Sequence, residues 1–121
     1  MAQDIKKQDK SISVNVKISL EEIANLIGET CAESYGIIGL TQSRSLKEKV
    51  IILTKKNYVE GVNVTRELGK FNVDIHIVVA SGVKITEIAS ELSKRITYVL
   101  KKKYGELFKK VNVYVEEIRE I

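Results

Sequence analysis

The chain has 121 residues, of which 44% are hydrophobic and 30% charged, and it carries a net charge of +4. This length suits one globular domain that buries roughly two-thirds of the surface its unfolded chain exposes. No apolar run approaches the roughly 18 residues that a membrane helix needs, and residues 1–10 lack the apolar core of a signal peptide. The one cysteine cannot form an internal disulfide. We therefore expect a cytoplasmic protein with a disordered lead-in at residues 1–10 and a single domain over residues 11–121.

A strand and a helix open the predicted domain. Residues 11–18 alternate between apolar and polar side chains, which is typical of a strand covered on one face. Ser19 and Glu22 then have the spacing of a helix capping box, and apolar residues recur at helical spacing up to Cys31. Gly28 lowers the stability of this helix, and a close helix contact there would explain it. Cys31 is most simply a buried hydrophobe, with a reactive thiol as the alternative.

Tyr35 and Gly36 end the first helix, and residues 37–41 follow as a short apolar strand. Residues 36–39 spell GxxG, the loop with which KH domains clamp a nucleic-acid backbone. That loop is exposed between two helices, whereas this stretch leads from a helix into a strand. Residues 43–58 fit a short amphipathic helix slightly better than a strand, because the flanking lysines and glutamates favour helices.

The second half of the chain contains the clearest elements. Residues 62–65 and 71–79 alternate as two strands, and a turn near Gly69 predicts that they form an antiparallel hairpin. Residues 85–100 then switch to helical spacing, and the helix ends near Gly105.

Residues 111–116 alternate again and form the last predicted strand. The whole order predicts an α+β fold, a two-layer sandwich with a mixed sheet of about five strands and two long helices on one face. The other sheet face would carry polar side chains: Ser13, Asn15, Lys17, Asn63, Thr65, Asn72, Asp74, His76, Asn112, Tyr114 and Glu116. The candidate contacts on this face are Asn72, Asp74, His76, Asn112 and Tyr114.

Asp74 and His76 are the candidates for chemistry, because both point to that open face. Such a pair could act as a base or hold a metal, but one histidine without further ligands or a nucleophile favours a structural role. Residues 82–85 could hold an anion at a helix start, although a turn is the simpler interpretation. No P-loop, dinucleotide or zinc-protease motif is present. We expect no enzyme activity, no cofactor and no catalytic or metal-binding residue.

Basic charge is concentrated in residues 43–110, which hold 15 basic and 7 acidic side chains and hence a net +8. It falls into two clusters, Arg44, Lys47, Lys49, Lys55 and Lys56, and then Lys101, Lys102, Lys103, Lys109 and Lys110. These could form a solvated rim, or bind nucleic acid, anionic lipid or an acidic partner. RNA-binding sheets stack bases on several aromatic residues, and the open face has only Tyr114. A nucleic-acid (RNA) binding module remains the alternative function.

The order of motifs resembles the alkaline shock protein family, also called envelope stress response or general stress proteins, of Gram-positive-type bacteria. The resemblance covers about residues 12 to 118, and no one piece of it is specific alone. The stretches that carry it are Ile18-Ser19, Tyr35 to Leu40, Gly61 to Val64, Val73 to Val79, Gly82 to Ala89 and Val111 to Val115.

This resemblance implies a small, cytoplasmic, non-enzymatic protein that associates with the membrane through a separate membrane-anchored partner and supports cell-envelope homeostasis. It provides no catalytic or binding residues that could be assigned to positions in this chain. Self-association and a protein partner are therefore the expected interactions, with no direct insertion into the membrane.

Overall fold

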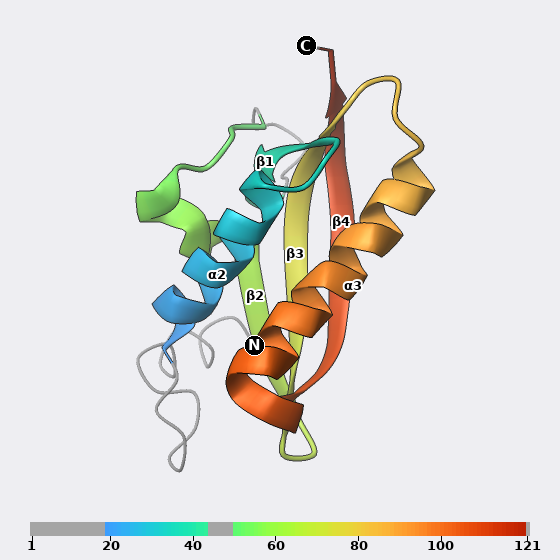
Figure 1. Ribbon diagram of the computed structural model, residues 1–121. Helices are drawn as coiled ribbons and strands as arrows, with labels where there is room; N and C mark the ends of the chain where they lie inside the picture. Colours follow the sequence, from blue (N-terminus) through green and yellow to red (C-terminus); the bar gives the residue numbers. More distant parts are fainter. Residues whose placement is uncertain (1–18, 44–49, 121) are drawn as a thin grey trace.

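The computed structural model describes residues 19–43 and 50–120, and its elements are arranged as Figure 1 shows. The elements in chain order are α2 (Leu20–Ala32), β1 (Ile37–Leu40), the 3-10 helix η1 (Lys55–Gly61), β2 (Val62–Glu67), β3 (Lys70–Ala80), α3 (Ile85–Tyr104), the 3-10 helix η2 (Gly105–Leu107) and β4 (Phe108–Arg119). The strand predicted at residues 11–18 and the lead-in at residues 1–10 lie outside the described residues.

All other described strands pair with β3, and the sheet is mixed, as predicted. β1 and β2 pair antiparallel with β3, at residues 77–79 and 70–75 respectively, while β4 pairs parallel with it from Phe71 to Ala80. Because β4 occupies one edge of β3 over nearly its whole length, β1 and β2 share the other edge (Figure 1). The described part of the chain thus forms a sheet of four strands.

The predicted hairpin is confirmed, and its turn is tight. Glu67 faces Lys70 in the register, which leaves only Leu68 and Gly69 between the two strands. Both turn residues have positive φ, 52° and 81°, as the common two-residue hairpin turn requires. Leu68 is strained there because it carries a Cβ atom, whereas glycine adopts this conformation freely.

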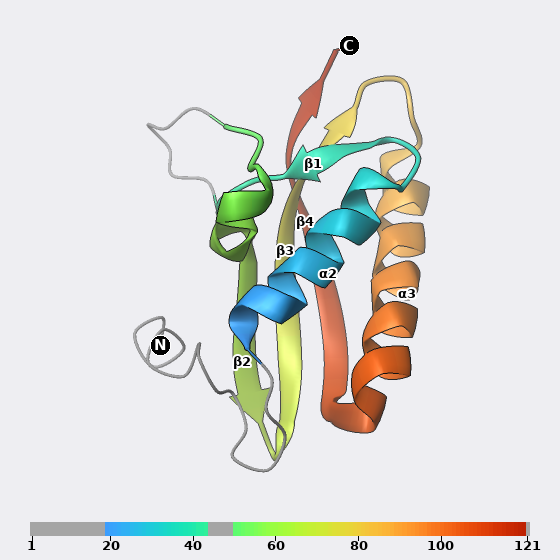
Figure 2. The ribbon, with the colours of Figure 1, turned by 60° about the vertical axis from the view of Figure 1, so that its left-hand side comes forward.

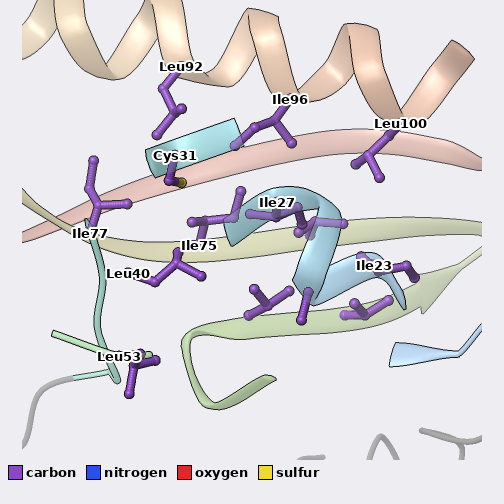
Figure 3. Packing of buried hydrophobic residues seen from close by; sticks show 14 of the residues in the cluster. Ile23, Ile27, Cys31, Leu40, Leu53, Ile75, Ile77, Leu92, Ile96 and Leu100 are labelled. Carbon is purple, nitrogen blue, oxygen red and sulfur yellow. The ribbon is translucent and has the colours of Figure 1, made fainter. Parts of the chain in front are cut away.

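The predicted core is also confirmed, because one face of β3 is buried at period two. Its five apolar side chains are Phe71, Val73, Ile75, Ile77 and Val79, none more than 2% exposed. They pack with Ile23 and Ile27 of α2 and with the α3 stripe Leu92, Ile96 and Leu100 (Figure 3). In Figures 1 and 2, α2 and α3 lie on the same side of the strands.

The predicted start of α2 is half confirmed. The backbone N–H of Glu22 donates to Ser19 Oγ at 3.1 Å, which caps the helix as expected. The Glu22 carboxylate, which a capping box would direct back to Ser19, instead accepts a long 3.5 Å hydrogen bond from Tyr104 Oη. Glu22 therefore links the start of α2 to the end of α3.

The helix preferred for residues 43–58 is wrong for residues 50–54, while residues 55–58 belong to a 3-10 helix. Residues 50–54 have no regular structure, and η1 begins only at Lys55; residues 44–49 lie outside the described residues. The Leu53 N–H donates to Leu40 O at 2.8 Å, and Thr41 Oγ1 donates to Ile51 O at 2.7 Å. These long-range bonds tie the segment to the end of β1, which local sequence preference does not reveal.

The short strand predicted after Gly36 is confirmed, because Ile37–Leu40 forms β1 and pairs with β3; the GxxG stretch at residues 36–39 is therefore not an exposed KH loop. One expectation about the sheet is corrected. The second sheet face is not open throughout, since Val78 and Ala80 are buried. Ile52 lies over Gly39, where an added Cβ would be 2.8 Å from Ile52 Cγ2, and Gly39 is the register partner of Val78.

The close contact expected at Gly28 is present: the ring of Tyr58, in η1, lies where a Cβ would be. Replacing Gly28 by alanine should therefore lower the free energy of unfolding by about 1–3 kcal/mol, measured by urea denaturation. In a Tyr58→Ala background the same change should be neutral or stabilising by about 1 kcal/mol, because only the helix preference for alanine remains. An equal loss in both backgrounds would show that the Tyr58 ring is not the cause.

Candidate functional site

The candidate site is the polar face of the sheet, built by β3 and β4. Because the two strands run parallel in register, Asp74 is the partner of Asn112 and His76 is the partner of Tyr114. Alternation along each strand places these four side chains on the face opposite the core. The structure therefore brings the predicted face residues together from positions nearly forty residues apart.

These side chains are fixed by bonds to one another. Asn112 Nδ2 donates to Asp74 Oδ1 at 2.9 Å, and His76 Nδ1 lies 2.7 Å from Glu116 Oε2. The rings of His76 and Tyr114 stack with centroids 5.2 Å apart and planes at 19°. His76 is only 9% exposed, whereas Tyr114 is 46% exposed. The face thus has a buried histidine, bonded to a partly buried carboxylate and stacked on an accessible tyrosine.

Asp74 and His76, the pair singled out from the sequence, bond to other residues. The true partner of His76 is Glu116, which lies at an irregularity in β4: Ile77 faces Val115, but Val78 faces Glu117. The extra residue in β4 is Glu116, and its side chain turns to His76. The sequence shows Glu116 as a polar face residue but contains no local signal for this bulge.

Asn72 extends the polar face toward the hairpin. Its Nδ2 donates to Glu67 Oε1 at 2.8 Å. This hydrogen bond and the positive charge of Lys109 hold the pKa of Glu67 below its usual value. Asn72 Oδ1 is buried and has no hydrogen-bond partner within the described part of the chain.

The polar face offers few side chains that could act in catalysis. A carboxylate beside a histidine can orient the ring, which is one part of a general-base site. Among residues 19–43 and 50–120, no group of three or more His, Cys, Asp and Glu side chains could hold a metal ion. His76 also borders a pocket together with Ser19, Gln42 and Val62, where β1 ends and β2 begins.

The basic clusters lie apart from each other, and Lys110, the register partner of Asn72, lies at the end of the polar face nearest the hairpin. Lys55 and Lys56 are in η1 beside α2, whereas residues 101–103 form the last turn of α3, at the lower end of that helix in Figures 1 and 2. Arg44, Lys47 and Lys49 lie outside the described residues. Lysines at the end of α3 also complement the negative end of the helix dipole.

Several of the described lysines have partners within the chain. Lys55 pairs with Glu29 at 3.5 Å, Lys101 with Glu106 at 3.4 Å and Lys109 with Glu67 at 3.8 Å. Lys102 and Lys103 lie over the rings of Tyr98 and Tyr104. These exposed pairs are weak individually, and glutamates neutralise only some of the lysines in the two clusters.

Taken together, the described residues define a small α+β protein whose distinctive feature is a bonded, partly exposed polar sheet face. None of its described helices is both long enough and apolar enough to cross a bilayer. The chain belongs to the alkaline shock protein 23 family, which is described as having a cell envelope-related function and whose sequence model matches residues 7–120. This confirms the family resemblance seen in the sequence.

Two relatives have similar lengths. The uncharacterised protein YloU of Bacillus subtilis (strain 168) is 32% identical over 105 residues, which cover 86% of this chain and 88% of that protein. The uncharacterised protein Spy1614 of Streptococcus pyogenes serotype M6 is 32% identical over 106 residues, covering 86% and 87%. Among solved structures, a MamM CTD matches 81% of this chain and 98% of its own, with a TM-score of 0.49 and 14% sequence identity.

Proposed function

We propose that this chain is a non-enzymatic binding and scaffold protein of the cytoplasm that self-associates and docks at the cell envelope through a protein partner. Membership of a family with a cell envelope-related function supports this role. As part of the same proposal, residues 11–121 belong to a single domain.

The observation that carries the proposal is the bonded polar face. Asp74, His76, Asn112 and Glu116 hold one another by hydrogen bonds, so the face keeps one shape without a ligand. A surface that is already ordered loses little conformational entropy when it binds, which favours recognition of a macromolecule. Tyr114 stands on this face with half of its surface accessible, and tyrosine is enriched at interface hot spots.

The protein should be tagged and purified from its own cells with and without nuclease, beside two variants. Tyr114→Ala removes the exposed ring of the polar face; Tyr98→Ala removes a ring on α3 that is even more exposed, and it is the control. We expect an envelope protein to be recovered despite nuclease, about tenfold less with Tyr114→Ala and unchanged with Tyr98→Ala, because loss of a hot-spot aromatic typically costs more than 1 kcal/mol.

Two outcomes would contradict this function. In the first, only ribosomal proteins and RNA are recovered, and they are lost on nuclease treatment. The protein would then bind nucleic acid through its basic clusters, and this binding should fall steeply with salt. Equal recovery of the envelope protein by both tyrosine variants would show that the polar face is not the binding surface.

A further inference from the structure

The edge of β4 that faces away from β3 has no partner strand among residues 19–43 and 50–120. β4 is 12 residues long and forms the outer strand of the sheet in Figure 1. Such an edge presents a row of backbone N–H and C=O groups that another strand can pair with. Its central part is regular, because the register with β3 is interrupted only before Lys110 and after Val115.

The side chains of β4 are complementary to those of a second β4 running antiparallel. If two copies meet with Val113 opposite Val113, then Val111 faces Val115, Asn112 faces Tyr114 and Lys110 faces Glu116. Directly opposed residues of opposite charge stabilise an antiparallel pair. The pairing thus has one pair of opposite charges at each end. Lys109 and Glu117 lie beyond it, and within one copy they pair with Glu67 and Arg119.

Neighbouring registers lose this match. Centring the pairing on Asn112 places Lys110 opposite Tyr114 and Lys109 opposite Val115, without any ion pair. Centring it on Tyr114 places Lys109 opposite Arg119, a pair of like charges. A shift by a single position would set apolar side chains against polar ones on each face. The charge pattern of β4 therefore favours one register.

From this complementarity we infer that the β4 edges of two copies pair antiparallel about Val113 and join the two sheets into one. The inference rests on the proposed self-association and specifies its surface. Lysines and bulges on an edge strand usually prevent pairing. On β4, however, Lys110 lies near the start and Glu116 near the end, so a copy related by a two-fold axis places each of these lysines opposite a glutamate.

This pairing would place both copies' helices on the same side of the joined sheet, because the two-fold axis is perpendicular to it. The two polar faces would then also form one continuous surface. Glu116 already bonds to His76 and would also form an ion pair with Lys110 of the second copy. A carboxylate has enough acceptor sites for both partners.

Cysteine cross-linking tests the register. Asn112→Cys and Tyr114→Cys should be made as separate variants, oxidised alone and then after mixing. Residues 112 and 114 of different copies would be directly opposite, about 5 Å apart between Cβ atoms, whereas the same residue in both copies would be about 7–8 Å apart. We expect at least fivefold more cross-linked dimer from the mixture than from either variant alone. The native Cys31 is buried and should not contribute.

A charge reversal gives an independent measurement that leaves the polar-face bonds in place. Lys110→Glu should weaken dimerisation roughly tenfold in sedimentation equilibrium, because two attractive pairs become repulsive. The matched control, Lys102→Glu, makes the same charge change on the exposed side of α3 and should leave dimerisation unchanged. Circular dichroism checks that both variants fold.

The possible failures can be told apart. A dimer in sedimentation whose mixed variants cross-link no better than each alone would overturn the β4 register and leave the proposed self-association standing. A monomer at every concentration would overturn both. A monomer whose outer β4 amides are nevertheless protected from hydrogen exchange would show that another part of this chain, such as residues 11–18, covers the edge.

Discussion

Replacing Ile75 by alanine should lower the free energy of unfolding by about 3–5 kcal/mol, among the largest effects of a single substitution in this protein. Ile75 is fully buried in the middle of β3, between β2 and β4 and beneath α2 and α3. Because side chains from both helices and the sheet meet there, the surrounding structure can collapse little to fill the cavity. Urea denaturation measures the change as a lower midpoint at a constant slope.

The matched control is Ile51→Ala, which removes the same atoms from a side chain that is 66% exposed. It should change the free energy of unfolding by less than about 0.5 kcal/mol. Similar losses for the two variants would show that β3 is not the centre of the core.

At alkaline pH, the buried thiol of Cys31 should destabilise the protein. Burial raises the pKa of Cys31 from 9.0 to about 12. The unfolded chain can ionise this thiol above pH 9 while the folded protein cannot, so the stabilisation present below pH 9 is lost as the pH rises toward 12. The loss is about 1.4 kcal/mol per pH unit, or about 2 kcal/mol at pH 10.5.

Cys31→Ala isolates this effect from other groups that titrate in the same range. The variant should be less stable than the native protein at about pH 8, because it leaves a small cavity, and the difference should shrink or reverse by about pH 10.5. Urea denaturation at the two pH values measures it. A difference that is independent of pH would mean that the thiol ionises equally in the folded protein.

The same burial predicts that alkylating reagents modify Cys31 only on unfolding.

Much of the fold could be predicted because its information is local. The period of two in β3 and of 3.6 in α3 identified both elements and their buried faces, and Gly105, with φ of 72°, ends α3 as expected. The short turn identified the β2–β3 hairpin. These features depend on residues only a few positions apart.

What the sequence did not reveal depends on pairing between distant segments. β4 extends beyond the predicted residues 111–116 because β3 offers backbone partners along its whole length. The His76–Glu116 bond requires both the parallel register of β4 and its bulge, neither of which alternation can show. Residues 50–54 are not helical because β1 holds their backbone, although their composition favours a helix.

The central position of β3 has a consequence for synthesis of the chain. α2 is made before any of β3, yet its apolar stripe, including Ile23 and Ile27, is buried in one cluster with side chains of β3 and α3. A ribosome adds roughly 5–20 residues per second, so this stripe stays without its partners for several seconds. During that interval the nascent helix exposes an apolar surface, which makes this early segment a site where chaperones or premature association would act.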